Sequence, residues 1–539
     1  MNNTMQPEEI SAVHHNRFVP ALYLFPLLLL CAGVFLLWPY YRFYIDPDAI
    51  SYLTLVDSYL AGDYQHAVNA FWSPMGCWTT VLVVKLTGLP LFAAAITANT
   101  LPAAGMVVLG QVLFHRFRYN AWERLCFGIM SALFWTYTVY FQSFTDIWQF
   151  FFLTLGLLIL LQPSFTRRPL LWVLLGLVAA LSYFSKAYSF YFFPLMILVV
   201  SGMQLRGAGV FSWGLLFRIC LVSVGVMMLA AAPWLWLIHE KYRIWTSSTA
   251  GKLNFSWWLA GTQELRPDIS VLVPPPPYSN SIFYFEDPYL VQGRFVHFYD
   301  SLRLFIKQLG RVGFNAIGWV ESANRISPFY FVTWLVSIVF LFSKGLSFFN
   351  TTEKKILLVV FLIFPLPYWT VTFDGGRYLW FTIPLSAILG LWYAQLIFPL
   401  MSERMKRLFV FVFCCTYLVA PVADMKEMFG TGREEYRMSE AMKSMGIQGS
   451  FVSNLSYASG KGRLHRIAWF TGSPWYCHTL DRYSNEEILE DARRYHVQYY
   501  YYFYEGTGAD YVLKDGQGNP YPEVTGGRIK GLRVFRLGF

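Results

Sequence analysis

Long apolar runs recur along this chain of 539 residues, and they limit what it can fold into. The first run, at 20–39, reads PALYLFPLLLLCAGVFLLWP and contains no charged residue. A helix of roughly 20 apolar residues is what crosses the hydrocarbon core of a bilayer. Charged residues make up only 14% of the sequence, whereas soluble domains usually contain about 25%. The chain is therefore predicted to be an integral membrane protein.

The runs together predict a polytopic α-helical fold with about eleven transmembrane helices. They lie near 20–39, 90–114, 123–142, 147–162, 169–185, 188–203, 213–238, 328–343, 355–372, 378–398 and 407–423. The formal net charge of +10 does not indicate a nucleic-acid partner, because the basic residues stand singly between these runs. The seven cysteines fall mostly inside the runs, and their spacing indicates neither a disulfide framework nor a zinc site.

The lysines and arginines between the runs predict the orientation. If the runs cross alternately, the basic clusters fall on one side, which the positive-inside rule makes cytoplasmic. These clusters contain Arg116, Arg118, Arg124, Arg167, Arg168, Arg206, Lys344, Lys354, Lys355, Arg404, Lys406 and Arg407. The N-terminus is then cytoplasmic, and the residues after 424 are extracytoplasmic. The segment 72–89 carries Lys85 and begins with Pro74 and Gly76, so we interpret it as a juxtamembrane helix at the outer surface.

The composition of the sequence changes after residue 424. Charged and turn residues become frequent, and Ser484 with Glu487 three positions later predicts a capping box at the start of an amphipathic helix. The stretches 497–505, 511–522 and 532–537 are predicted to be strands. We therefore expect a transmembrane domain over 1–423, with outer segments at 40–89 and 239–327, and a small extracytoplasmic α/β domain over 424–539.

Ionisable residues on the predicted outer side, close to the ends of the runs, are the candidate functional residues. Charges at a membrane edge tend to be paired and functional, and short outer loops ordinarily avoid Lys and Arg. Cations and carboxylates that meet on one face would suit an anionic ligand with an acid/base site beside it. The residues are Asp46, Asp48, Asp146, Lys186, His239, Lys241 and Arg377.

Each of these residues also has a structural interpretation. Asp48 follows Pro47 and could cap the helix that begins there, and Asp146 could cap the helix that follows it. Lys186 and Arg377 could extend to the lipid headgroups. His239 could be an ordinary interfacial residue. Asp48→Asn separates a cap from a catalytic base, because Asn caps a helix as well as Asp does but cannot accept a proton.

Five stretches, in order along the chain, resemble the GT-C class of polytopic glycosyltransferases, in particular its aminoarabinose and protein-mannosyl transferase branch. They are PDAISYLTLVDSYLAGDY at 47–64, FWSPM at 71–75, SFTDIWQFFFLTLGLLIL at 143–160, YFSKAYSFYFFPL at 183–195 and GGRYLWFTIPL at 375–385. The resemblance covers nearly the whole chain and assigns the catalytic function to 1–423.

The resemblance implies a role for particular residues. Asp48 would be the base, rather than Asp46, because Tyr52 stands at the matching interval; Asp146 would be the second acidic residue. The carrier phosphate would be held by Lys186 and Arg377, with Tyr378 beside them, and by Lys85, since Trp72 and Ser73 stand where the family often has a lysine. His239 is a further candidate. No cofactor is certain, although Asp46, Asp48 and Asp146 could hold a divalent ion.

The function implied is that of an inverting glycosyltransferase in the inner (plasma) membrane. It would move a sugar from a polyprenyl-phosphate carrier to a glycan, lipid or protein acceptor on the extracytoplasmic face, with no nucleic-acid partner. Two alternatives stay open: an oligosaccharide ligase or polymerase that uses a pyrophosphate carrier, which would favour additional cations in the pocket, and a transporter or flippase for a lipid-linked saccharide. The sequence identifies neither the sugar nor the acceptor.

Overall fold

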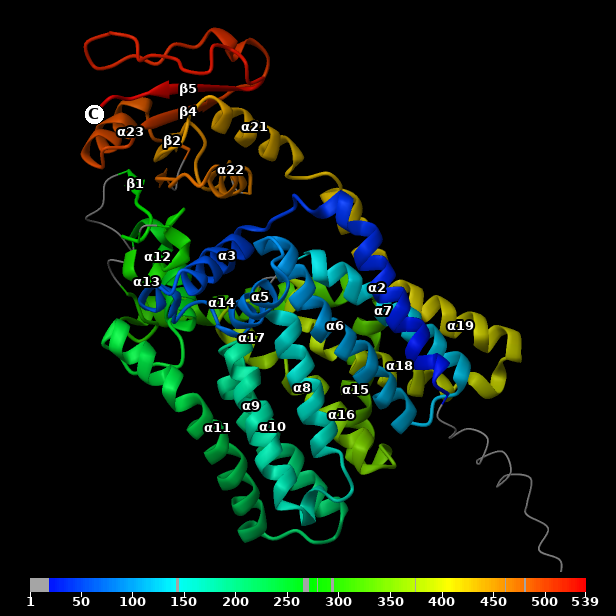
Figure 1. Cartoon of the computed structure of the whole chain (residues 1–539). Coiled ribbons are helices and arrows are strands. Elements are labelled where there is room, and N and C mark those ends of the chain that lie inside the picture. The colour runs from blue at the N-terminus through cyan, green and yellow to red at the C-terminus, as the bar shows by residue number, and fades with distance from the viewer. Residues whose placement is uncertain are drawn as a thin grey trace, which may run out of the picture.

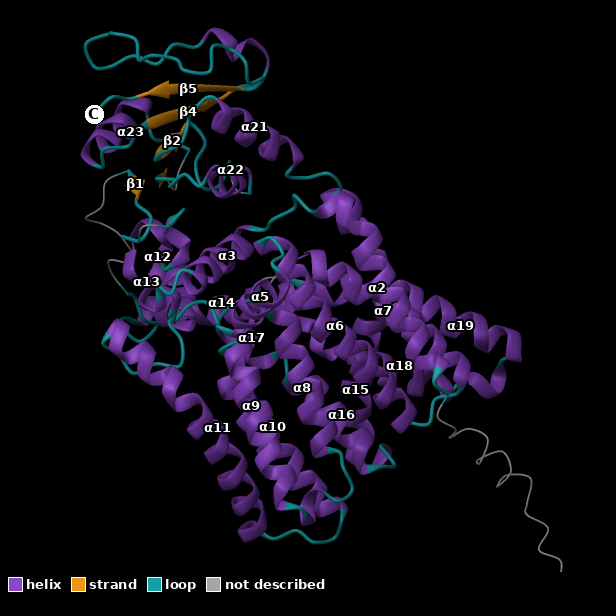
Figure 2. Ribbon diagram, in the orientation of Figure 1, coloured by secondary structure: helices purple, strands orange, loops and turns teal. Residues whose placement is uncertain are grey.

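The computed structural model describes residues 19–141, 145–264, 271–278, 280–291, 295–373, 375–460, 462–478 and 481–539. The chain forms three layers (Figure 1). Long helices stand beside one another at the bottom of the view, and helices such as α3 (Pro47–Leu60) and α5 (Met75–Thr87) lie across their upper ends. The C-terminal strands and helices form the top layer (Figure 2).

The lower layer contains the helices that the apolar runs predict. Its first members are α2 (Ala21–Tyr41), α6 (Leu91–Arg116), α7 (Ala121–Phe141), α8 (Asp146–Leu160), α9 (Pro169–Ser185), α10 (Tyr188–Gly207) and α11 (Trp213–Tyr242). Small residues let these helices approach closely, as is usual for membrane helices. A Cβ atom on Gly176 of α9, for example, would lie 2.4 Å from the backbone oxygen of Ser223 in α11.

Five helical stretches are long and apolar enough to cross a membrane among the residues that the structure describes. They are Ala21–Tyr41, Leu91–Arg116, Tyr188–Gly207, Trp213–Tyr242 and Glu403–Ser444. Shorter apolar helices occupy Met75–Thr87, Asp146–Leu160, Pro169–Ser185 and Pro328–Lys344. The number of crossings, predicted as about eleven, stays a prediction.

The last three predicted runs are broken rather than continuous. The run 355–372 is divided at Pro365 into α16 (Thr352–Ile363) and α17 (Leu366–Thr370), because proline lacks the N–H that a helix interior needs. The run 378–398 begins as the 3-10 helix η4 (Gly376–Thr382) and continues as α18 (Ile383–Gln395). The run 407–423 ends early, and α19 (Glu403–Thr416) gives way to α20 (Val419–Met428).

The middle layer comes from the two segments predicted to lie outside. The first supplies α3, α4 (Tyr64–Ala67) and α5, so the expected helix within 72–89 is present. The second supplies α12 (Ala250–Glu264), β1 (Leu272–Val273), α13 (Pro288–Val291) and α14 (Leu302–Ile326), and α15 (Pro328–Lys344) follows it. The 25-residue amphipathic helix α14 was not predicted.

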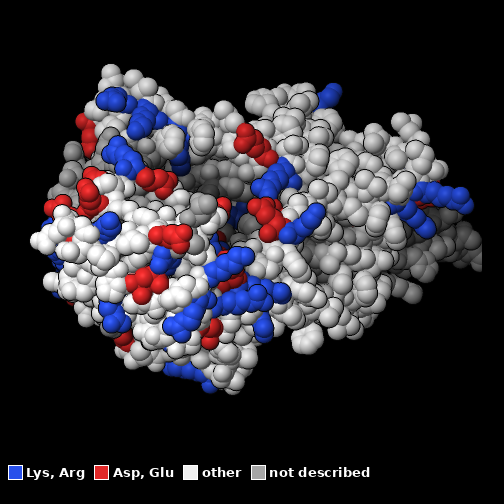
Figure 3. All heavy atoms as spheres, turned by 90° about the horizontal axis from the view of Figure 1, so that it is seen from above, with Lys and Arg blue, Asp and Glu red and all other residues white. Residues whose placement is uncertain are grey.

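The C-terminal region combines a sheet with helices. It contains α21 (Arg433–Ser444), β2 (Phe451–Ser453), α22 (Arg463–Thr471), β3 (Cys477–His478), α23 (Asn485–Arg494), β4 (Tyr499–Phe503) and β5 (Leu532–Arg536). The sheet order is β2-β4-β5, with β2 parallel and β5 antiparallel to β4. Charged side chains of both signs intermingle over this region, whereas the rest of the same face carries few (Figure 3).

The local predictions for this region have a mixed outcome. The capping box is confirmed, since the Ser484 backbone N–H donates to Glu487 over 2.8 Å and the Glu487 N–H donates to the Ser484 hydroxyl over 3.3 Å. The strand expected over 511–522 is wrong, because that stretch makes only an isolated bridge between Lys514 and Pro520. Strand β1 pairs antiparallel with β3, which ties the segment 239–327 to the C-terminal region.

Candidate active site

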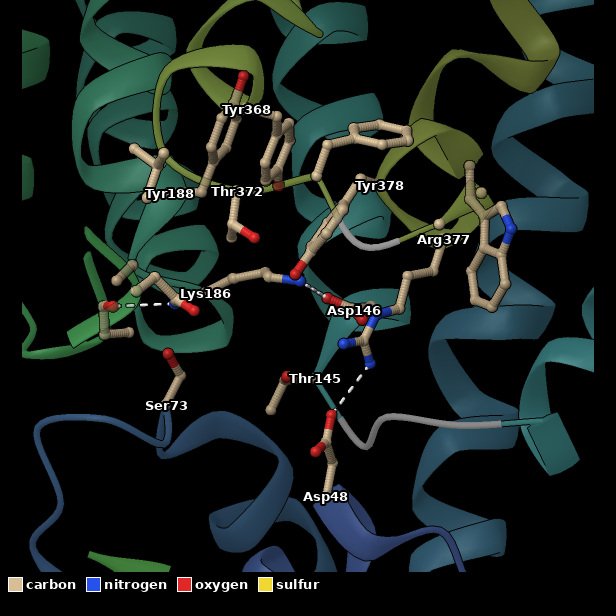
Figure 4. A pocket seen from close by; sticks show the side chains of 18 of the residues that line it. Asp48, Ser73, Thr145, Asp146, Lys186, Tyr188, Tyr368, Thr372, Arg377 and Tyr378 are labelled. Atoms are coloured by element: carbon tan, nitrogen blue, oxygen red, sulfur yellow. Dashed lines mark hydrogen bonds and ion pairs between the residues drawn. The ribbon is translucent and has the colours of Figure 1, made fainter. Parts of the chain in front are cut away.

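A cavity of about 1220 Å³ lies where the three layers meet. Helix ends and loops from distant parts of the sequence line it, including Tyr457 from the C-terminal region. The structure brings most of the predicted site residues to this one cavity (Figure 4). Those that line it are Asp46, Asp48, Tyr52, Asp146, Lys186, Arg377 and Tyr378.

The first ion pair in the cavity joins Arg377 to Asp48. The Arg377 Nη1 atom lies 3.1 Å from the Asp48 Oδ2 atom, and the two side chains are 14% and 27% exposed. Asp48 does not cap α3. That position belongs to Asp46, whose carboxylate accepts from the Asp48 backbone N–H over 2.9 Å. The cap holds the first turn of α3, and the Asp48 side chain is directed into the cavity (Figure 4).

The second ion pair joins Lys186 to Asp146. Asp146 is the first residue of α8, and Lys186 stands at the break between α9 and α10, where its extended backbone lets the side chain reach across. Burial lowers the pKa of Lys186 from its usual value, and the neighbouring Asp146 opposes this shift. Thr145 precedes Asp146, and its hydroxyl is hydrogen-bonded to the Tyr52 hydroxyl over 3.1 Å.

Tyr378 connects the two ion pairs. The Lys186 ammonium lies 4.5 Å from the centre of its ring, and the Arg377 guanidinium carbon lies 5.4 Å from the same centre. Both cations therefore lie close to one aromatic ring, which stabilises them electrostatically. Gly375 makes this placement possible, because its φ of +80° is a conformation that favours glycine and turns the chain into η4.

Two predicted site residues do not line the cavity: Lys85, which was predicted to bind the phosphate, and His239, which was a further candidate. Lys85 is exposed on the last turn of α5. His239 stacks on Trp245, with ring centres 4.1 Å apart. Lys241, on the same helix as His239, forms a buried ion pair with Asp287 over 3.0 Å.

Several cavity residues were missed by the sequence argument. Arg311 of α14 donates to the Thr372 hydroxyl over 2.9 Å, and its guanidinium carbon lies 4.1 Å from the centre of the Trp258 ring. Lys252 of α12 also lines the cavity. The signal that could have found Arg311 is the apolar periodicity of 302–326, which predicts an amphipathic helix inside the segment 239–327.

The sequence leaves open a divalent ion at this site. Among the residues that the structure describes, no group of three or more His, Cys, Asp or Glu side chains is placed to hold a metal ion. Asp48 and Asp146 each contact a cationic side chain instead. A metal ion would have to displace those contacts, so this donor set fits a divalent ion poorly.

No protein-family model matches the chain, and no curated protein matches it by sequence. Two crystal structures of ArnT from Cupriavidus metallidurans are similar to it in fold. The apo structure has a TM-score of 0.52 and the structure bound to undecaprenyl phosphate has 0.51, each at 13% identity over 95% of this chain and 97% of that chain. An oligosaccharyltransferase from Archaeoglobus fulgidus has a TM-score of 0.46 at 11% identity, over 90% of this chain and 68% of that chain.

The likeness to ArnT extends over almost the full length of both chains, and it agrees with the resemblance carried by the five sequence stretches. The identity is low, so the likeness establishes the arrangement of the elements and not the chemistry of the site. The chain has the fold of the GT-C glycosyltransferases.

Proposed function

We propose that this protein is an inverting glycosyltransferase that moves a sugar from a polyprenyl-phosphate carrier to an acceptor on the extracytoplasmic face of the inner membrane. Its N-terminus would be cytoplasmic and its C-terminal α/β region extracytoplasmic. The observation that carries the proposal is the joint placement of two carboxylate–cation pairs, Asp48 with Arg377 and Asp146 with Lys186, in one cavity of a GT-C fold. ArnT, which shares this fold, binds undecaprenyl phosphate.

The cations would stabilise the leaving phosphate. A phosphate departs readily from the anomeric carbon, and the charge that develops on it needs donors that are already in place. Arg377 offers a planar fork of N–H groups, and Lys186 offers a compact charge beside it. Both lie over the face of Tyr378, so the phosphate would meet an ordered pair of donors.

Asp48 would act as the general base. In a single displacement the acceptor oxygen or nitrogen forms a bond to the anomeric carbon while the carbon–oxygen bond to phosphate breaks. The bonding electron pair leaves with the phosphate, and the acceptor proton passes to the Asp48 carboxylate. Attack opposite the leaving group inverts the anomeric centre. The Arg377 Nη1 atom, 3.1 Å from the Asp48 Oδ2 atom, holds this carboxylate in place before substrate binds.

An aromatic wall suits the lipid part of the carrier. The rings of Tyr188 and Tyr368 stack with centres 4.1 Å apart, and both residues line the cavity beside Lys186 (Figure 4). Tyr191, one turn further along α10, also lines the cavity and is 68% exposed. A polyprenyl chain could leave the cavity past Tyr191 toward the apolar flank of α10 while its phosphate stays at Lys186.

Arg311 and Lys252 favour a second candidate, a transferase that uses a pyrophosphate carrier. A second phosphate group would need additional cations, and these two residues supply them at the wall formed by α12 and α14. A transporter or flippase for the same lipid is the candidate from another class. It would need the binding site but not the base.

The proposal is tested with purified protein in lipid vesicles. Undecaprenyl phosphate carrying single sugars is supplied as donor, with a lipid and glycan extract of the source envelope as acceptor, and products are identified by mass spectrometry. We expect loss of the donor and an added sugar residue on an acceptor. Undecaprenyl pyrophosphate donors test the second candidate in parallel. Lipid-linked sugar that only changes leaflet, with its glycosidic bond intact, would indicate a flippase.

A further inference from the structure

A third carboxylate–cation pair lines the same cavity, away from the two already described. The Arg325 guanidinium at the end of α14 contacts the Asp424 carboxylate of α20. The Tyr137 hydroxyl of α7 donates to the Asp424 Oδ2 atom over 2.8 Å. All three residues line the cavity, and none of them was among the sequence candidates.

This cluster is only partly enclosed by protein. The Asp424 side chain is 12% exposed, but that of Arg325 is 67% exposed. A pair whose only role is to join helices is worth little when one partner faces solvent to this degree. Arg325 has five N–H donors, and among the residues that the structure describes it contacts Asp424, so it can offer further donors to a ligand.

Aromatic side chains form the wall beside this cluster. Tyr137 and Phe141, one turn apart on α7, stack with ring centres 4.9 Å apart. Trp380 of η4 packs against both rings, at 6.1 and 6.2 Å. Trp380 follows Arg377 by three positions, and residues three apart on a 3-10 helix share a face. The aromatic wall therefore begins directly beside the Asp48–Arg377 pair.

We infer that this end of the cavity, formed by Tyr137, Phe141, Trp380, Arg325 and Asp424, is a saccharide subsite. A sugar ring has an apolar C–H face, which packs on aromatic rings, and a rim of hydroxyls, which need both donors and acceptors. Asp424 accepts from hydroxyls and Arg325 donates to them, and both bonds are charge-assisted. The cavity volume of about 1220 Å³ exceeds the ~300–1,000 Å³ of a site for one small ligand, so two substrates can occupy it together.

The inference rests on the proposed function. It assigns a role to a part of the cavity that the residues proposed for the phosphate and for the base do not occupy. The hydroxyls could belong to the donor sugar, which is attached to the phosphate at Lys186 and Arg377, or to a saccharide acceptor that approaches Asp48. The hydroxyls would be recognised in the same way in both cases. Asp424 and Tyr137 would affect the affinity for the donor in the first case and the KM of the acceptor in the second.

The test uses the full-length protein with two variants and two matched controls. Tyr137→Phe removes one hydroxyl and keeps the ring, and Asp424→Asn removes the charge. Tyr140→Phe, on the same helix but outside the cavity lining, and Glu427→Gln, exposed on the same helix as Asp424, are the controls. Affinities are measured for bare undecaprenyl phosphate and for undecaprenyl phosphate carrying glucose, mannose or arabinose. The KM and kcat of transfer are measured with the envelope extract as acceptor.

If the subsite takes the donor sugar, wild-type protein binds at least one sugar-bearing carrier more tightly than the bare carrier. The Tyr137→Phe and Asp424→Asn variants then bind that sugar-bearing carrier about tenfold more weakly, and their affinity for the bare carrier is unchanged. If it takes the acceptor, donor affinities stay the same and the acceptor KM rises about tenfold, with kcat little changed.

The inference is overturned if both variants behave as their controls in every measurement, or if they weaken the bare carrier as much as the sugar-bearing one. Failure of the proposed function has a different signature. Wild-type protein and controls would then neither bind bare undecaprenyl phosphate nor transfer sugar, and the inference would fall with it.

Discussion

The Arg377 guanidinium lies 3.1 Å from the Asp48 carboxylate, although 329 positions separate the two residues in the chain. One cation thus faces both the proposed base and the place where the proposed leaving phosphate would bind. A phosphate bound to Arg377 would compete for this contact and leave the Asp48 carboxylate available to the acceptor. The pair would therefore couple donor binding to activation of the acceptor.

Asp48→Asn should abolish transfer without unfolding the protein. The amide cannot accept a proton, and general-base catalysis typically contributes about 10²–10⁴-fold in rate, so kcat should fall by that factor. Thermal unfolding in detergent should be unchanged, because Asp46 and not Asp48 caps α3. Asp46 supplies the control: Asp46→Asn should keep the cap, whereas Asp46→Ala should cost about 1 kcal/mol of stability. Full activity of Asp48→Asn would remove Asp48 from the mechanism.

Arg377→Lys should weaken the binding of undecaprenyl phosphate by about 10- to 100-fold, the range expected for one lost charge-assisted hydrogen bond. Lysine keeps the positive charge but cannot present two N–H groups to a phosphate and to Asp48 at once. The measurement is a binding isotherm in detergent. Lys344→Arg, an exchange of the same two side chains at an exposed position of α15, is the control. If Arg377→Lys and wild type bind undecaprenyl phosphate with equal affinity, a bidentate contact between Arg377 and the phosphate is excluded.

Donor binding should depend on pH through Lys186. Burial lowers the pKa of this ammonium, so the charged form that holds phosphate is fully present at low pH and is lost as pH rises through a value below that of an ordinary lysine. The alkaline limb of the kcat/KM profile reports this group in the free enzyme. Lys186→Arg, which stays charged, should move that limb to higher pH. If the alkaline limb falls at the same pH in both proteins, it reports a group other than Lys186.

The stability of the protein should fall as pH rises from about 4.5 to about 8 through the contribution of Glu286. Burial raises the pKa of Glu286 from 4.5 to about 8. The folded state thus keeps a proton that the unfolded chain releases at a lower pH, and the stabilisation present below 4.5 is lost across that window.

Glu286→Gln should flatten this part of the pH dependence, measured as the difference in unfolding temperature between variant and wild type. The amide oxygen can still accept from the Ile282 backbone N–H, which donates to Glu286 over 2.7 Å in the wild-type protein. The exposed Glu427→Gln should leave the pH dependence as it is. A slope that Glu286→Gln does not alter would show that Glu286 is ionised in the folded state at neutral pH.

A reporter fused after residue 430 should behave as extracytoplasmic. The basic clusters between the apolar runs place that point on the outer side by the positive-inside rule. Alkaline phosphatase fused there should be active, and a fluorescent protein that matures only in the cytoplasm should be dark. A fusion after Arg206, in a predicted cytoplasmic loop, is the control. There alkaline phosphatase should be inactive and the fluorescent protein should be bright. The opposite result at 430 would break the predicted topology and put the cavity on the wrong side for the proposed reaction.

Local sequence patterns predicted the elements well where one element carries its own signal. The capping box at Ser484 and most of the long helices are as expected. The errors fall where local signals are ambiguous. The stretch 511–522 has the composition of a strand but bends back on itself at Asp515, whose backbone N–H donates to the carbonyl of Asn519 over 2.9 Å. The run 378–398 predicts one continuous helix, but it begins as the 3-10 helix that carries Arg377.

Candidate site residues could be found from sequence because a charge next to an apolar run is costly and so stands out. Ser143 and Phe144, which belong to one of the five quoted stretches, lie outside the described residues. Lys85 was assigned to the phosphate only through the family resemblance, and it does not line the cavity. Asp424 directly follows the predicted run 407–423, but it opens a stretch where charges are common, so it does not stand out.

The sequence by itself determined that the chain forms long apolar helices, that an α/β region follows them, and which charged residues are unusual for their surroundings. Only the tertiary structure decided which of those charges meet, and it added Arg311, Arg325 and Asp424 to the cavity. The physical reason is the distance along the chain over which each kind of signal acts. Hydropathy and capping depend on neighbours within a turn or a single helix, whereas an ion pair depends on how whole helices pack and where each side chain points at the helix end.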